Sequence, residues 1–123
     1  MKIFRFDLES GQGEGQFGSV KAIIARTVQL DNEAKVNAVY LHPDRNIIEP
    51  QALTQQLFLI VEGDGWVKGN SDEKLVVRQG QVIFWEIDES HESGTETGMT
   101  AVIIECVDVD SADLMPLLQE YEP

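Results

Sequence analysis

Residues 55–67 read QQLFLIVEGDGWV, and this stretch decides the fold class. The apolar run at residues 57–61 is rich in β-branched and aromatic side chains, and it leads into Gly63-Asp64-Gly65. A second strand-like pair, Trp66-Val67, follows at once. Strand-forming residues on both sides of a glycine-rich turn signal are typical of a β-hairpin. We therefore predict two strands joined by a tight turn.

A second unit of the same kind follows soon after. Residues 79–85, QGQVIFW, again place a turn glycine, Gly80, before an apolar strand, and this strand ends shortly before His91. Side chains alternate between the two faces of a strand. On the strand that begins at residue 55, one face carries Gln56, Phe58 and Ile60, and the other carries Leu57, Leu59 and Val61. Because both faces are largely apolar, we expect one to line an interior and the other to pack against a second layer.

Length and composition favour one globular unit. The chain has 123 residues, of which 42% are hydrophobic, and this suits a single core of modest size. We therefore expect one domain over residues 1–123. No apolar run approaches the roughly 18 residues of a membrane span, and charges recur too often in residues 1–7 for a secretory signal. These features predict a cytoplasmic protein with no membrane partner.

The strong negative charge excludes one class of partner. The formal net charge is −13 at pH 7, whereas affinity for nucleic acid depends on Lys and Arg side chains that neutralise phosphates. The acidic residues are dispersed, with small clusters at residues 86–89 and 120–122, and no calcium-loop spacing is present. A solvated acidic surface explains them, and no nucleic-acid partner is expected.

Strand-like runs separated by turn signals fill most of the remaining chain. They are residues 2–6 as an edge strand, 20–30 and 34–41 as an antiparallel pair, 47–48, 74–78, and 99–107 as a strand buried on both faces. The glycine-rich residues 9–19 are expected to be a connector, since they precede a strand and lack the lysine of a phosphate-binding loop. About nine short strands with frequent turns are typical of a β-sandwich or barrel.

Two further features concern the end of the chain. Asp110 and Ser111 offer N-cap oxygens to a short C-terminal helix running toward Tyr121, although Pro116 disfavours a long one. The single cysteine, Cys106, lies in the apolar run 101–107 and has no second cysteine to pair with. A buried, unreactive thiol is the expected outcome.

The first of the two glycine-bearing units resembles the first signature motif of the cupin family. That motif reads His-x-His, three or four residues, Glu, six residues, Gly. Gly63 supplies the glycine, and Gln56 stands at the glutamate position. With the four-residue gap, Glu49 and Gln51 stand at the histidine positions. With the three-residue gap, Pro50 and Ala52 stand there instead, and Glu49 leaves the site.

The second unit resembles the second cupin motif, which reads Gly, five residues, Pro-x-Gly, two residues, His, three residues, Asn. Gly80 and His91 match it, whereas Glu86, Asp88 and Thr95 stand at the Pro, Gly and Asn positions. The resemblance implies an all-β, antiparallel double-sheet jelly-roll barrel of the RmlC-like kind. Its motif-bearing core covers about residues 36–107, and the short C-terminal helix follows.

The resemblance also bears on cofactors, because a usual cupin site holds a divalent metal between three histidines and a carboxylate. This chain offers one imidazole, His91, and one carboxylate, Glu49, beside the weakly donating carboxamides of Gln51 and Gln56. No tightly bound catalytic metal is therefore expected. A divalent metal, if one binds, would use His91 and Glu49.

Three functions stay open. In the first, a pocket binds a small polar ligand of unknown identity; its predicted residues are Glu49, Gln51, Gln56, Phe58, Trp85 and His91, with Ile60 as a further apolar wall. In the second, the protein is an isomerase, an epimerase or a metal-dependent oxygenase that uses Glu49 and His91. In the third, the barrel is a structural or dimerisation module. The apolar strands and the resemblance together predict a homodimer.

Overall fold

The computed structural model describes residues 1–7, 12–13, 23–24, 33–49, 53–106 and 115–120. These residues contain strands and no helix, and therefore no helix that could cross a membrane. The strands are β1 (Lys2–Arg5), β2 (Gln12–Gly13), β3 (Ile23–Ile24), β4 (Ala34–Leu41), β5 (Arg45–Glu49), β6 (Gln55–Lys68), β7 (Leu75–Arg78), β8 (Gln81–Trp85), β9 (His91–Thr95), β10 (Met99–Cys106) and β11 (Leu117–Glu120).

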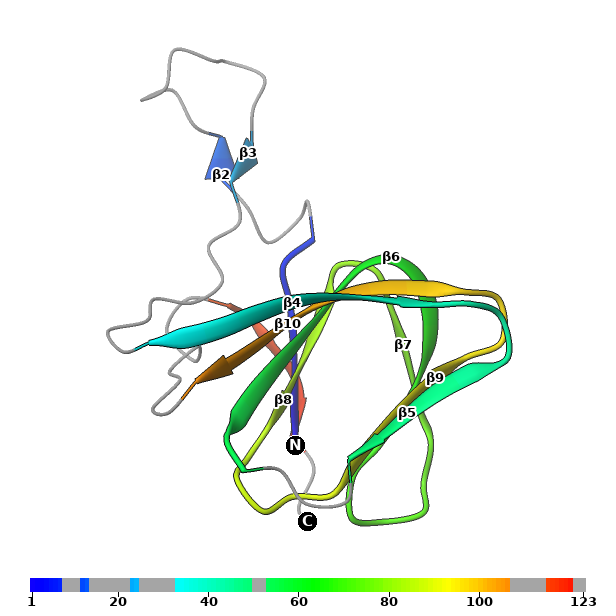
Figure 1. Ribbon diagram of the computed structural model, residues 1–123. Coiled ribbons are helices and arrows are strands. Elements are labelled where there is room, and N and C mark those ends of the chain that lie inside the picture. Colours follow the sequence, from blue (N-terminus) through cyan, green and yellow to red (C-terminus); the bar gives the residue numbers. More distant parts are fainter. Residues whose placement is uncertain (8–11, 14–22, 25–32, 50–52, 107–114, 121–123) are drawn as a thin grey trace.

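Two antiparallel layers curve around a common interior (Figure 1). One layer has the strand order β11-β1-β8-β6-β10-β4. The other is formed by β5, β9 and β7 together with the second half of β6. The strand β6 is thus shared by both layers, which makes the fold the expected double-sheet barrel.

The predicted hairpin at residues 55–67 is wrong, because these residues form one continuous strand. The first part of β6 pairs with β10 and β8, and the second part pairs with β7 and β9. The glycine that looked like a turn residue is the bend between the layers: Gly63 has a φ of 86°. A Cβ at Gly63 would collide with the carbonyl oxygen of Gly98 on the neighbouring chain segment. The glycines therefore let a long strand bend and let another backbone approach, which is a different use of the same residues.

Three other expectations also change. β1 lies between β11 and β8, so it is not an edge strand. The predicted pairing of residues 20–30 with 34–41 is wrong for the described residues 23–24. These residues form β3, which pairs with β2, whereas β4 pairs with β10. In place of helix, residues 117–120 form β11 beside β1; residues 110–114 of the predicted helix lie outside the described residues. Pro116 cannot continue a helix, and its carbonyl accepts the N–H of Arg5 at 3.1 Å.

The alternation of side chains along β6 is confirmed. Phe58 and Ile60 belong to the cluster that fills the barrel, whereas Leu57 and Leu59 belong to a second cluster on the outer side of the larger layer. The interior cluster also holds Met1, Ile3, Val67, Val77, Ile83, Trp85, Met99 and Ala101. The outer cluster includes Cys106, which is free and buried as expected.

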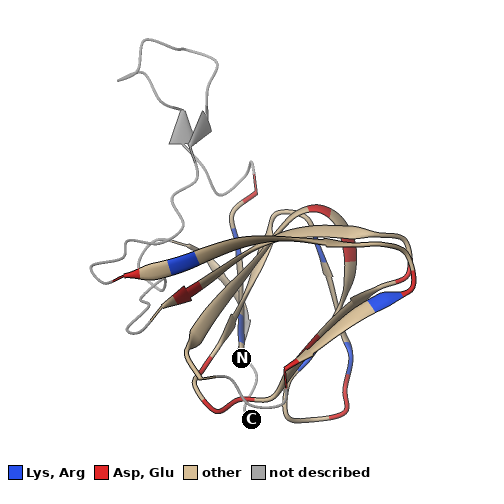
Figure 2. Ribbon diagram, in the orientation of Figure 1, with Lys and Arg blue, Asp and Glu red and all other residues tan. Residues whose placement is uncertain are grey.

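Acidic side chains are spread over strands and loops and do not gather on one element (Figure 2). This agrees with the dispersed pattern in the sequence.

Candidate functional site

Polar side chains enter the barrel interior at one end of the larger layer. Strand register places Gln56 of β6 between Trp85 of β8 and Glu105 of β10. Gln56 is buried, and its Nε2 donates to Glu105 Oε1 at 3.3 Å. The apolar neighbours Phe58 and Ile60 follow on the same face of β6. A carboxamide and a carboxylate are thus held at the rim of an otherwise apolar interior.

The second layer brings His91 to the same end. His91 is the first residue of β9 and stands opposite Glu49, the last residue of β5. His91 Nε2 lies 3.3 Å from Glu49 Oε2, which is within the distance of an ion pair. This contact is not a hydrogen bond, and Nε2 has no hydrogen-bond partner among the described residues. His91 is 6% exposed, whereas the side chain of Glu49 is 40% exposed, so the open side of the site is at Glu49.

A stack of rings joins the two layers. The rings of Trp85 and His91 have centroids 4.3 Å apart and planes inclined by 19°. Phe58 contacts Trp85 edge-on, with centroids 5.9 Å apart. The loop between Trp85 and His91 is held by Glu89, whose Oε1 accepts the N–H of Glu86 at 3.0 Å. The turn reverses the chain between β8 and β9, so Trp85 and His91, at the two ends of the loop, lie beside each other.

The indole nitrogen of Trp85 is the most unusual atom of the site. Trp85 is 0% exposed, and its Nε1–H has no hydrogen-bond partner among the described residues. An unsatisfied buried donor costs about 1–3 kcal/mol, and for this reason such atoms are rare in native proteins. Trp85 Nε1 and His91 Nε2 are the two such side-chain atoms in the described part of the chain, and their rings are stacked.

His91 is held in its neutral form near pH 7. Burial lowers the pKa of its imidazole below the ordinary value of 6.5, and the negative charges of Glu89 and Glu105 offset part of this effect. A neutral imidazole has one donor nitrogen and one acceptor nitrogen. The contact with Glu49 is therefore not a charged pair at neutral pH.

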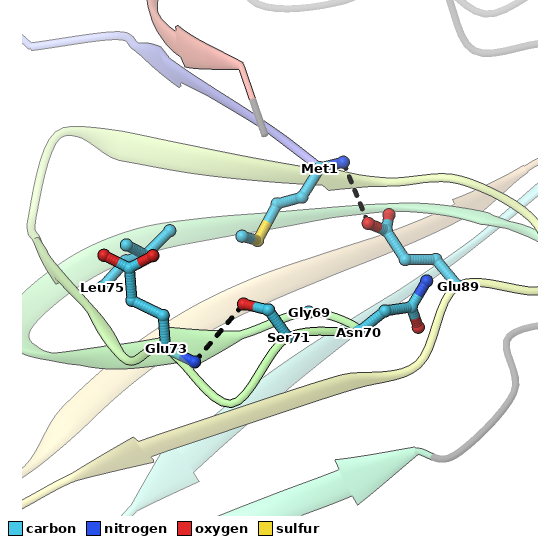
Figure 3. A pocket seen from close by; sticks show the side chains of 7 residues that line it. All are labelled: Met1, Gly69, Asn70, Ser71, Glu73, Leu75 and Glu89. Carbon is cyan, nitrogen blue, oxygen red and sulfur yellow. Dashed lines mark hydrogen bonds and ion pairs between the residues drawn. The ribbon is translucent and has the colours of Figure 1, made fainter. Parts of the chain in front are cut away.

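Glu89 also lines a pocket of about 230 Å³ (Figure 3). The α-amino group of Met1 contacts Glu89 Oε2 at 2.9 Å, and both groups are buried. The side chain of Met1 lies between Leu75 and Glu89 in this view, and the β6–β7 loop closes the pocket. The lining residues are Met1, Gly69, Asn70, Ser71, Glu73, Leu75 and Glu89. The charge of Glu89 is thus already paired with an ammonium group.

A larger open hollow of about 460 Å³ lies beside the β9–β10 turn. It is lined by Tyr40, Leu41, His42, Pro43, Glu62, Gly63, Thr97, Gly98, Met99 and Thr100. Neither of the unpaired buried atoms belongs to it. His42 is exposed there.

The structure brings five of the six predicted site residues together, namely Glu49, Gln56, Phe58, Trp85 and His91. Gln51 lies outside the described residues, as do Pro50 and Ala52 of the alternative alignment. The sequence analysis missed Glu105. A charged residue inside the apolar run AVIIECV was the signal that could have found it, since buried charges are rare unless they are used or paired.

The described residues bring few metal-ligating side chains together. Within the described part of the chain, no group of three or more His, Cys, Asp or Glu side chains is placed to hold a metal ion. Glu49 and His91 lie together, but the described residues bring no third such ligand to them.

No family model and no curated protein matches the sequence. Solved structures do match. A cupin superfamily protein from Desulfitobacterium hafniense is 12% identical, with a TM-score of 0.57, over 72% of this chain and 80% of that one. A predicted oxalate decarboxylase from Thermotoga maritima is 17% identical, with a TM-score of 0.53, over 66% and 68% of the two chains. A salicylate 1,2-dioxygenase variant from Pseudoaminobacter salicylatoxidans is 15% identical, with a TM-score of 0.55, over 58% of this chain and 20% of that one.

The chain therefore has the cupin fold, as the two motif frames implied. Its structural neighbours include enzymes as well as a protein named only for its superfamily. Identities this low show the shared fold and leave the activity open.

Proposed function

We propose that the barrel end around Trp85 and His91 binds a small polar molecule and holds no tightly bound catalytic metal. The observation that supports this most is the unpaired indole N–H of Trp85, buried beside the unpaired Nε2 of His91. A ligand oxygen that accepts from Trp85 would satisfy the buried donor. The unpaired N–H of Trp85 would then be a preformed part of the binding site.

Each residue of the site has a role in this proposal. Trp85 Nε1 donates, His91 Nε2 and the Gln56 carboxamide provide further polar contacts, and Phe58 and Ile60 form the apolar wall. Glu49 lies where the site is most exposed, so ligands would enter past its carboxylate.

The two tryptophans of the chain make the proposal testable. We would titrate the protein with a panel of polyols, amino alcohols and hydroxy acids while following the two indole N–H signals by NMR. A binding ligand should move the Trp85 signal and leave the Trp66 signal in place. Trp85→Phe should weaken binding about tenfold, the worth of one hydrogen bond. Trp66→Phe is the matched control, since Trp66 packs against Gly94 and under Lys74, away from the unpaired atoms. A panel in which nothing moves the Trp85 signal would contradict the proposal.

Metal content is a separate test. Elemental analysis of protein purified without an affinity tag should find well under one metal ion per chain, unchanged in His91→Ala. Stoichiometric metal that disappears in His91→Ala would favour a metal-dependent activity instead.

A second candidate function is acid–base catalysis by Glu49 and His91, as in an isomerase or epimerase. The observation in its favour is a neutral imidazole held 3.3 Å from a carboxylate, because a neutral histidine can take a proton near pH 7. Such an enzyme should lose most of its rate in Glu49→Gln and in His91→Gln while still binding its substrate. Equal loss of binding and rate would instead indicate a binding role for both residues.

A further inference from the structure

We propose that the site selects ligands by charge: it takes a small protonated amine with a neighbouring hydroxyl or carbonyl oxygen, and it rejects carboxylates. This proposal rests on the proposed binding function and names the chemical class of the ligand.

Two carboxylates at the site lack a cationic partner among the described residues. Glu49 lies beside His91, and Glu105 accepts a hydrogen bond from Gln56. Two cations near the site are engaged by other carboxylates: the Met1 ammonium contacts Glu89, and Lys68 pairs with Glu92 at 3.4 Å. Lys35 stands opposite Glu105 in the sheet but is exposed, and the described ion pairs do not join the two. The site is therefore negative.

The hydrogen-bonding capacity of the site residues determines which groups a ligand must carry. Trp85 Nε1 can only donate, so it requires an acceptor oxygen on the ligand. Glu49 can only accept when ionised, and it lies 3.3 Å from His91 Nε2 without a hydrogen bond between them. An ammonium group carries three donors. It can donate to Glu49 Oε2 and to His91 Nε2 at once, in the imidazole tautomer that leaves Nε2 an acceptor.

The same arrangement disfavours an anion. A ligand carboxylate could accept from Trp85, but it would enter past the carboxylate of Glu49 and lie in the field of Glu105, and no described ion pair with a Lys or Arg neutralises either glutamate. Like charges a few ångströms apart at partly buried sites repel strongly enough to lower affinity by about tenfold or more. In this proposal the buried N–H of Trp85 contributes to the affinity for the ligand oxygen, and Glu49 and Glu105 select cationic over anionic ligands.

Three molecules of nearly equal size provide the test: isopropanolamine, propylene glycol and lactate, which are cationic, neutral and anionic at pH 7. Each is titrated into the intact protein while the Trp85 indole N–H signal is followed by NMR. We expect the amine to bind best, the diol about tenfold more weakly, and lactate not measurably. Glu49→Gln and Glu105→Gln should each reduce the preference for the amine over the diol. Glu96→Gln, an exposed carboxylate away from the site, should leave the preference unchanged.

Lactate binding as tightly as the amine, or equal binding of all three, would overturn the charge selection and leave the binding function standing. Failure of all three to move the Trp85 signal would overturn it as well. The proposed binding function itself would fail only if the wider panel also left that signal in place.

Discussion

Trp85 and His91 are buried side by side, yet each keeps one nitrogen without a hydrogen bond among the described residues. Such atoms are rare in folded proteins. Removing a polar group from water costs free energy, and this cost is offset only when the group forms a hydrogen bond inside the protein. Hydrophobic packing offsets the cost: Trp85 belongs to the interior cluster, Phe58 makes an edge-type ring contact with it, and His91 stacks on the ring of Trp85. Apolar and ring contacts thus position both side chains, while one nitrogen of each ring is left without a hydrogen bond among the described residues.

The lowered pKa of His91 predicts a pH dependence of stability. Because the folded state disfavours the charged imidazole, the unfolded chain binds more protons between the folded pKa and the ordinary value of 6.5. The contribution to stability is complete above pH 6.5 and is lost as the pH falls through this window. Urea unfolding of the wild type and of His91→Gln at several pH values checks this: the wild type should lose stability relative to the variant on acidification. A constant difference at all pH values would contradict it.

The strand β6 decides how the barrel is put together. It belongs to both layers, and its bend at Gly63 occurs where it leaves β10 for β7 and β9. The pairing of β6 with β10 shifts register close to this bend: Thr100 pairs with Glu62 and Ala101 with Ile60, so Val61 of β6 is the extra residue. Bulges of this kind let a strand turn out of one sheet and into another. Gln56 lies at the start of β6, before this bend, in the part of the strand that pairs with β8 and β10.

We expect Gly63→Ala to destabilise the protein strongly. A non-glycine residue at a positive φ costs roughly 1–3 kcal/mol, and the added Cβ would also collide with the Gly98 carbonyl. Gly69→Ala is the matched control, since a Cβ there would meet Glu89 and Met1 side-chain atoms at ordinary distances of 3.5 and 3.7 Å. Chemical denaturation of both variants measures the difference. Equal stability of the two would argue against the bend as a constrained position.

For the molecule as a whole, apolar surface remains on one side of the barrel. Among the described strands, β4 pairs with β10 alone, and its side chains Val36 and Tyr40 are 62% and 71% exposed. Beside them lie the partly buried Val102 and Ile104 of β10. An exposed apolar sheet face at an open edge favours association.

We therefore propose a homodimer formed on this face, in keeping with the expectation from the sequence. Light scattering should give twice the chain mass at micromolar concentration, and Val36→Lys should shift the equilibrium toward monomer because it buries a charge in the contact. Arg45→Glu, a charge change on the exposed part of β5, is the control. A wild-type protein that stays monomeric at these concentrations would contradict the proposal and also the role of a dimerisation module.

Local patterns determined much of this protein. Strand positions at 2–5, 34–41, 75–78, 81–85 and 99–106 were predictable, because alternation, β-branched residues and turn signals act over a few neighbouring residues. For the same reason the faces of β6 were predictable, and with them the inward position of Gln56 and Phe58. The frame of two glycine-bearing motifs indicated the cupin fold and singled out His91.

Only the tertiary structure decided which strands pair. Pairing joins residues far apart in the chain, and its energy depends on neighbours that a local pattern does not specify. Thus Gly63 bends a strand instead of closing a hairpin, and residues 117–120 pair with β1 instead of forming a helix. The site follows the same division, because its residue types were visible in the sequence but their contacts were not. Glu105 lies beside Gln56 through the pairing of β10 with β6. The stacked rings whose nitrogens lack partners come from the two different layers.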